Sequence, residues 1–158
     1  MSIRHIVRRT APLALIFSLI AFLAWNAYAE VNRVTFPANL DKLVHYSTVR
    51  RGNVTEHMLT SQAAIDTVKK GKAVPSGTHV VLVDYRDSEV FRYFVMEKRD
   101  GWSADFEPGR ATGDWQFQAF KPDRTVNLSE NSARCMSCHQ AQKDKQFLFT
   151  FNDLRGAK

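Results

Sequence analysis

The sequence is poor in cysteine and contains no repeat, low-complexity tract or long apolar run. Its only cysteines are Cys135 and Cys138. A structural zinc site needs four ligands, and no second Cys/His cluster lies near enough to complete the set. The longest apolar run, residues 11–25, is shorter than the ~20 residues that a membrane-spanning helix needs. Because no domain linker is present either, the composition favours a single domain.

Clustered positive charge is also missing. The chain has 22 Lys and Arg against 16 Asp and Glu. Three of the arginines lie within residues 1–29, which contain no acidic residue, so the remainder has an excess of only three positive charges. These charges are spread along the chain, and such a pattern does not indicate a nucleic-acid partner.

The first 29 residues have the composition of a secretory signal peptide. A basic start precedes the apolar run, and Ala27-Tyr28-Ala29 is a small-x-small cleavage site. We therefore expect cleavage after Ala29 and export to the periplasm, with no stable membrane insertion afterwards. Residues 30–158 would then form the mature domain. An uncleaved membrane anchor is the alternative.

Residues 135–139 read Cys-Met-Ser-Cys-His, and Cys-x-x-Cys-His is the attachment sequence for c-type haem. Positions i, i+3 and i+4 of a helix share one face. Cys135 and Cys138 could therefore both form thioethers with one porphyrin, and His139 could bind its iron as the proximal ligand. A redox disulfide is the alternative, but such a pair usually follows a strand in a thioredoxin-like setting. We predict one covalent haem c, with its iron, per chain.

Alternation of apolar and polar residues predicts a mainly β, α+β fold. In residues 115–120, for example, Trp115 and Phe117 alternate with Gln116 and Gln118. The predicted architecture is an antiparallel sheet of about five strands with a short helix and a C-terminal helix that carries the haem motif. Strands are expected at residues 43–49, 78–86, 89–98, 115–120 and 146–151, and helices after the caps Ser61 (or Thr60) and Ser129.

A mostly β chain with a C-terminal Cys-x-x-Cys-His resembles the cytochrome P-460 family, which includes the β-sheet cytochromes c′ (cytochrome c′-β). The likeness extends over most of residues 30–158, and the order of the segments around the haem motif is fairly specific. The segments are Phe36-Pro37, Val44 to Thr48, Lys69-Lys70-Gly71, Pro75 to Thr78, Gly113 to Phe117, Cys135 to His139 and Lys143 to Thr150.

The resemblance implies a monohaem periplasmic protein whose antiparallel sheet packs over the haem. It implies a His-ligated iron with an open distal face, and a homodimer. In the members named cytochrome P-460, a lysine is cross-linked to the porphyrin and hydroxylamine is oxidised. The cytochrome c′-β members lack this bond and bind nitric oxide or carbon monoxide beneath an apolar cap of phenylalanines.

The sequence departs from the cross-linking pattern at two positions. Leu82 occupies the place of the lysine, and no lysine lies between Lys72 and Lys98. The distal arginine of the family falls near Met58, which cannot donate a hydrogen bond. Both departures place the chain closer to the cytochrome c′-β type.

The distal side of the haem has three candidate residues, His57, Met58 and Leu82. His57 or Met58 could supply a sixth iron ligand. The ordinary alternatives are a surface histidine and a core methionine. Met96 is expected in the core, and Met136, inside the motif, should face away from the iron.

Other pocket candidates are charged or aromatic. Arginine or lysine side chains often pair with haem propionates, and a strand carboxylate could transfer protons, although most such charges are simply solvated. The basic candidates are Arg50, Arg134 and Lys143, and the acidic ones are Asp84 and Glu97. Aromatic walls could come from Trp115 and from Phe91, Phe94, Phe117, Phe147, Phe149 and Phe151, while His45 and His79 are expected to face solvent or to be hydrogen-bonded.

Three functions follow from this reasoning. The first is the binding of nitric oxide or carbon monoxide, and it is preferred because Leu82 replaces the lysine. The second is electron transfer with Met58 or His57 as a sixth ligand and a periplasmic redox partner. The third is oxidation of hydroxylamine or nitric oxide, which needs the lysine–porphyrin bond. Whether the protein is an enzyme stays open at this point.

Overall fold

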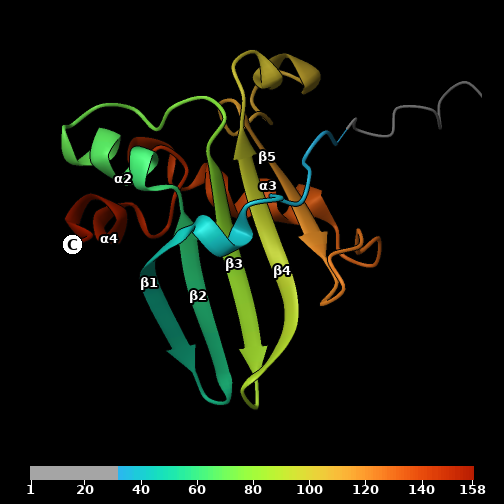
Figure 1. The fold of residues 1–158 in the computed structure, drawn as a ribbon. Coiled ribbons are helices and arrows are strands. Elements are labelled where there is room, and N and C mark those ends of the chain that lie inside the picture. Colours follow the sequence, from blue (N-terminus) through green and yellow to red (C-terminus); the bar gives the residue numbers. More distant parts are fainter. Residues whose placement is uncertain (1–31) are drawn as a thin grey trace, which may run out of the picture. The chain divides into compact units, whose positions relative to one another are not determined.

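The structure is a computed structural model that describes residues 32–158 (Figure 1). The predicted signal peptide and its cleavage site lie outside the described residues. Among the helices of this described part, none is long and apolar enough to cross a membrane.

The described chain forms one sheet whose neighbouring strands are all antiparallel, in the sequence order β1-β2-β3-β4-β5. Three α-helices accompany it, so the predicted mainly β, α+β class is confirmed. The strands are β1 (Val44–Arg51), β2 (Val54–Thr60), β3 (His79–Arg86), β4 (Glu89–Lys98) and β5 (Trp115–Phe120). The helices are α2 (Gln62–Lys69), α3 (Ser132–Gln140) and α4 (Phe151–Gly156), with short 3-10 turns at Leu40–Lys42, Trp102–Asp105 and Lys143–Lys145.

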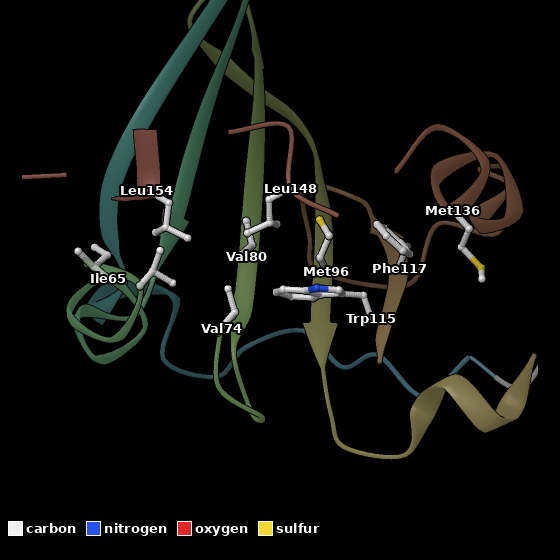
Figure 2. Packing of buried hydrophobic residues seen from close by; sticks show 10 residues of the cluster. Ile65, Val74, Val80, Met96, Trp115, Phe117, Met136, Leu148 and Leu154 are labelled. Atoms are coloured by element: carbon white, nitrogen blue, oxygen red, sulfur yellow. The ribbon is translucent and has the colours of Figure 1, made fainter. Parts of the chain in front are cut away.

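The three helices lie on one side of the sheet, which we call the helix face (Figure 1). Strand residues on this face pack with apolar residues of α2, α3 and α4. In Figure 2 the Trp115 indole lies in the middle of this cluster, between Val74 and Phe117. The buried members are Ile65, Val68, Val74, Val80, Met96, Trp115, Phe117, Met136, Leu148 and Leu154.

The segment before β1 covers the opposite face of the sheet. Phe36 contacts Tyr93 and Phe120 edge-on, with ring centroids 5.1 and 5.3 Å apart. Val34 joins the same cluster together with Val81 of β3. The sheet is therefore buried on both faces over part of its area, as the Val-rich sequence of β3 requires.

Two predictions about the elements need correction. β2 is not among the predicted strands, because its sequence, VTEHMLT, mixes polar residues into both faces. The strand predicted at residues 146–151 is wrong: Gln146 and Phe147 have φ angles of 53° and 64°, and α4 begins at Phe151. These left-handed angles are incompatible with a strand.

The helix caps give one confirmation and one further correction. Ser61 caps α2, its side chain accepting a hydrogen bond from the Ala64 amide. The cap predicted at Ser129 is Asn131 instead, whose side chain accepts from the Ala133 amide at 3.0 Å. The haem-motif helix therefore starts two residues later than the cap prediction implies.

Candidate cofactor site

A pocket of about 580 Å³ lies between the helix face of the sheet and α3. Cofactor pockets are commonly a few hundred to about 1,000 Å³ and mostly apolar, with a few polar groups. This one follows that pattern. Its walls come from β1 to β5, from α3 and from the chain after it, and the lining residues are Arg51, Met58, Val80, Leu82, Arg92, Phe94, Val95, Met96, Phe117, Gln118, Glu130, Asn131, Arg134, Cys135, Cys138, His139, Leu148, Phe149 and Thr150.

The helix α3 turns all three residues of the motif toward this pocket. Cys135, Cys138 and His139 line it together, as their i, i+3 and i+4 spacing on a helix requires. Met136 points the other way into the core, with 5% of its surface exposed. The face predicted from the spacing therefore exists, and it borders a space in which one ligand could meet all three side chains.

The two thiols differ in their surroundings. Cys135 is half-buried and Cys138 is exposed, and neither is in a disulfide. Burial, with a smaller effect from Glu130, raises the pKa of the Cys135 thiol. Both thiols are therefore uncommitted side chains on the pocket wall.

His139 is held in one orientation by the backbone. Its Nδ1 lies 2.6 Å from the carbonyl oxygen of Phe147, so Nδ1 carries the proton and donates, and Nε2 has a free lone pair for a metal. The rings of Phe117 and Phe149 flank the imidazole at centroid distances of 4.8 and 4.9 Å. Burial lowers the pKa of His139, although the bond to Phe147 opposes this effect. A lowered pKa favours the neutral form that a metal requires.

Across the pocket, three apolar side chains form a row on neighbouring strands. Met58 pairs with Leu82 in the β2–β3 register, and Leu82 pairs with Phe94 in the β3–β4 register. Residues directly opposite in a sheet point to the same face, and all three line the pocket. Of the three predicted distal candidates, the structure therefore brings Met58 and Leu82 to the site.

His57 is on the other face of the sheet. Successive strand residues point to opposite faces, so when Met58 faces the pocket, His57 faces away. Its ring packs between His45 and Tyr85, at centroid distances of 4.8 and 5.0 Å, and it is not a lining residue. The structure does not bring His57 to the pocket, and the reason is the strand β2 that the sequence pattern does not reveal.

Three arginines give the pocket wall its positive charge: Arg51, Arg92 and Arg134. Only Arg134 was among the predicted propionate partners; Arg50 and Lys143 do not line the pocket. The Arg92 guanidinium lies 4.6 Å from the Phe94 ring centroid.

Arg92 also joins the sheet to the segment before α3. Its Nε donates to Asp84 at 2.9 Å, and its Nη1 pairs with Glu130 on the pocket wall. Asp84 itself is 1% exposed and does not line the pocket. The sequence pattern did not single out Arg92, because an isolated arginine on a strand usually indicates a solvated position.

The remaining candidates have structural roles. Glu97 is buried away from the pocket and pairs with Arg99 and His79. Trp115 is a core residue whose Nε1 donates to the Gln146 carbonyl at 3.1 Å. Of the phenylalanines, Phe94, Phe117 and Phe149 line the pocket, whereas Phe91, Phe147 and Phe151 do not.

The residues present fit a haem c. Two thiols and one imidazole with a free nitrogen stand on one wall, and apolar side chains form the opposite wall. Arginines also line the pocket, and guanidinium groups are suitable partners for the two propionate carboxylates of a haem. The profile of the family described as cytochrome P460 matches residues 40–150, a range that includes the sheet, α2 and α3. No curated protein matches the chain.

Proposed function

The chain belongs to the cytochrome P460 family, and on that basis we propose that it is an exported monohaem c-type cytochrome that binds nitric oxide or carbon monoxide. Family membership implies haem and iron as the cofactor. In the proposal, Cys135 and Cys138 hold the haem as thioethers, His139 is the proximal ligand, and the distal side is open.

The observation that carries the proposal is the row of Met58, Leu82 and Phe94 opposite the thiols and the imidazole. Bound haem supplies an iron that can take a diatomic ligand. The side chains of the row are apolar and offer no strong hydrogen-bond donor, so this wall favours neutral diatomic molecules over charged or strongly hydrated ones. The chain's own contribution is thus an apolar distal wall and a fixed proximal imidazole.

The visible spectrum of the reduced, haem-loaded protein tests this proposal. We expect a five-coordinate, high-spin spectrum that becomes six-coordinate and low-spin when carbon monoxide is added. A six-coordinate low-spin spectrum in the absence of any added ligand would contradict an open distal site.

Electron transfer is the second candidate, and the position of Met58 on the pocket wall supports it. Met58→Leu keeps the volume and removes the sulfur. If gas binding is correct, this variant should have the spin state of the wild-type protein. Met96→Leu is the matched control, because Met96 also lines the pocket. A change from low-spin to high-spin in Met58→Leu alone would identify Met58 as the sixth ligand and favour electron transfer.

Hydroxylamine oxidation of the cross-linked type is disfavoured by the lining of the pocket. Leu82 is a lining residue, and among the described lining residues there is no lysine. The intact mass of the haem-loaded chain should therefore correspond to two thioether bonds and no further cross-link. The same mass measurement tests export, because cleavage of the signal peptide after Ala29 would give a chain that begins at Glu30.

A further inference from the structure

Gln146 and Phe147 are consecutive non-glycine residues in the left-handed region, with φ angles of 53° and 64°. L-residues rarely adopt this conformation, and two in succession persist only where surrounding contacts hold them. They lie in the turn after the haem-motif helix, residues 142–148, which we call the proximal strap. The contacts that hold the proximal strap in this conformation therefore indicate its role.

Hydrogen bonds hold the proximal strap on several sides. The Phe147 amide donates to the Gln142 carbonyl at 2.7 Å. The Trp115 indole Nε1 donates to the Gln146 carbonyl at 3.1 Å, and the Val74 amide donates to the Gln146 side-chain oxygen at 2.7 Å. Trp115 and Val74 come from a strand and a loop distant in sequence, so the turn is fixed to the main core of the domain.

Gly113 leaves room for the Phe147 ring of the proximal strap. A Cβ atom at Gly113 would lie 2.9 Å from Cε2 of Phe147, closer than real Cβ contacts allow, so the Phe147 ring can pack here only over a glycine. With the ring in this place, the carbonyl oxygen of Phe147 lies 2.6 Å from Nδ1 of His139.

We infer that the proximal strap sets the electron donation of His139 to the haem iron, with Gly113 and Trp115 as positioning residues. The inference rests on the proposed ligation of iron by His139. A hydrogen bond accepted from Nδ1–H orients the ring and makes it a stronger donor through Nε2. Stronger donation strengthens the iron–histidine bond and stabilises the ferric state.

Gly113→Ala in the haem-loaded protein tests this inference. The added methyl group should displace the Phe147 ring and lengthen the bond to His139. We expect the iron–histidine stretching band of the reduced protein, measured by resonance Raman spectroscopy, to move to lower frequency. The reduction potential should become more positive. Gly71→Ala is the matched control, because Gly71 also has a positive φ, +72°, but its added Cβ would meet nothing within 4 Å.

A double variant separates the specific contact from general strain. Phe147→Leu removes the ring atom that the new Cβ would meet. The double variant Gly113→Ala/Phe147→Leu should therefore have the same iron–histidine band and reduction potential as Phe147→Leu alone. Trp115→Phe, which removes the donor to Gln146, should shift both in the same direction as Gly113→Ala. It serves in place of Gly113→Ala if that variant does not fold.

The outcomes are distinguishable from those of the proposed function. The inference is overturned if Gly113→Ala leaves the iron–histidine band and the reduction potential unchanged, or if Gly71→Ala shifts them equally. Neither result would contradict ligation of the iron by His139. If the wild-type protein shows no iron–histidine band because its iron is six-coordinate, the open site is refuted. The potentials of the same variants then decide the inference on their own.

Discussion

At the residue scale, Asp84 depends on its arginine partners. It is 1% exposed, and its Oδ2 accepts from Arg92 Nε at 2.9 Å, whereas Arg86 approaches only to 3.5 Å. Removing one partner of a buried ion pair leaves a charge without compensation, which costs several kcal/mol. Because Arg86 remains and Arg92 is partly exposed, Arg92→Gln should lower the free energy of unfolding by about 3 kcal/mol. Urea unfolding of the haem-loaded protein at neutral pH measures this loss.

Arg51→Gln is the control for that experiment. Arg51 also lines the pocket, but its side chain is 66% exposed where it pairs with Glu56. Exposed ion pairs contribute less than about 1 kcal/mol, so this variant should be nearly as stable as the wild type. Equal losses in the two variants would show that burial of Asp84 is not the cause.

His79 should make stability depend on pH. Burial lowers its pKa below the ordinary value of 6.5, although the nearby Glu97 carboxylate opposes this effect. Below pH 6.5 the unfolded chain therefore binds the proton more readily than the folded one, and the free energy of unfolding falls as the pH falls. Urea midpoints at about pH 7.5 and about pH 5.5 should differ less in His79→Gln than in the wild type. An equal difference in His79→Gln and in the wild type would show that another group causes the pH dependence.

At the element scale, the start of α3 can be tested directly. Asn131 accepts from the Ala133 amide, whereas the Ser129 hydroxyl bonds to the Asn127 side chain. Loss of a cap side chain typically costs about 1 kcal/mol. Asn131→Ala should therefore lower the free energy of unfolding by about that amount, and Ser129→Ala by clearly less. If Ser129→Ala lowered the free energy of unfolding more than Asn131→Ala, Ser129 would be the cap, as the sequence pattern predicts.

The predicted elements succeed where local pattern and tertiary packing agree. β3, β4 and β5 have regular alternation or continuous Val-rich runs, and their observed bounds match the predicted ranges to within one residue. The segment QFLFTF alternates equally well, yet it forms a turn and the start of a helix. The hydrogen bonds of Gln146 with Trp115 and Val74 override the local preference for a strand. Such long-range bonds cannot be predicted from the alternation of apolar and polar residues.

The same distinction applies to the site. Cys135, Cys138 and His139 are identifiable from sequence because one helix turn contains all three. The pocket wall opposite α3 is assembled from three strands, so only the family resemblance places Met58 and Leu82 there. His57 is a candidate beside them because the sequence pattern does not predict β2. The acceptor of the His139 proton is a backbone carbonyl, for which no side-chain motif exists.

At the scale of the whole molecule, we expect one part of the domain to be stable without the pocket ligand and another part to depend on it. α2 buries Ala64, Ile65 and Val68 in the core, whereas α3 buries only Met136. An isolated helix of this length is not stable in water. On the pocket-facing side of α3, His139 contacts Phe117, Phe147 and Phe149, and the proposed haem would add the remaining contacts.

Hydrogen exchange can test this division. In the variant Cys135→Ser/Cys138→Ser, purified without haem, amides of α3 should exchange at least about tenfold faster than in the haem-loaded protein, equivalent to ~1.4 kcal/mol of local stability. Amides of β3 and β4 should keep their protection, because their cross-strand bonds and the apolar cluster on the opposite face of the sheet do not depend on the pocket ligand. α2 serves as the internal control. Equal protection of α3 in both forms would show that the helix is stable without haem, and loss of protection across β3 and β4 would show that the sheet depends on haem as well.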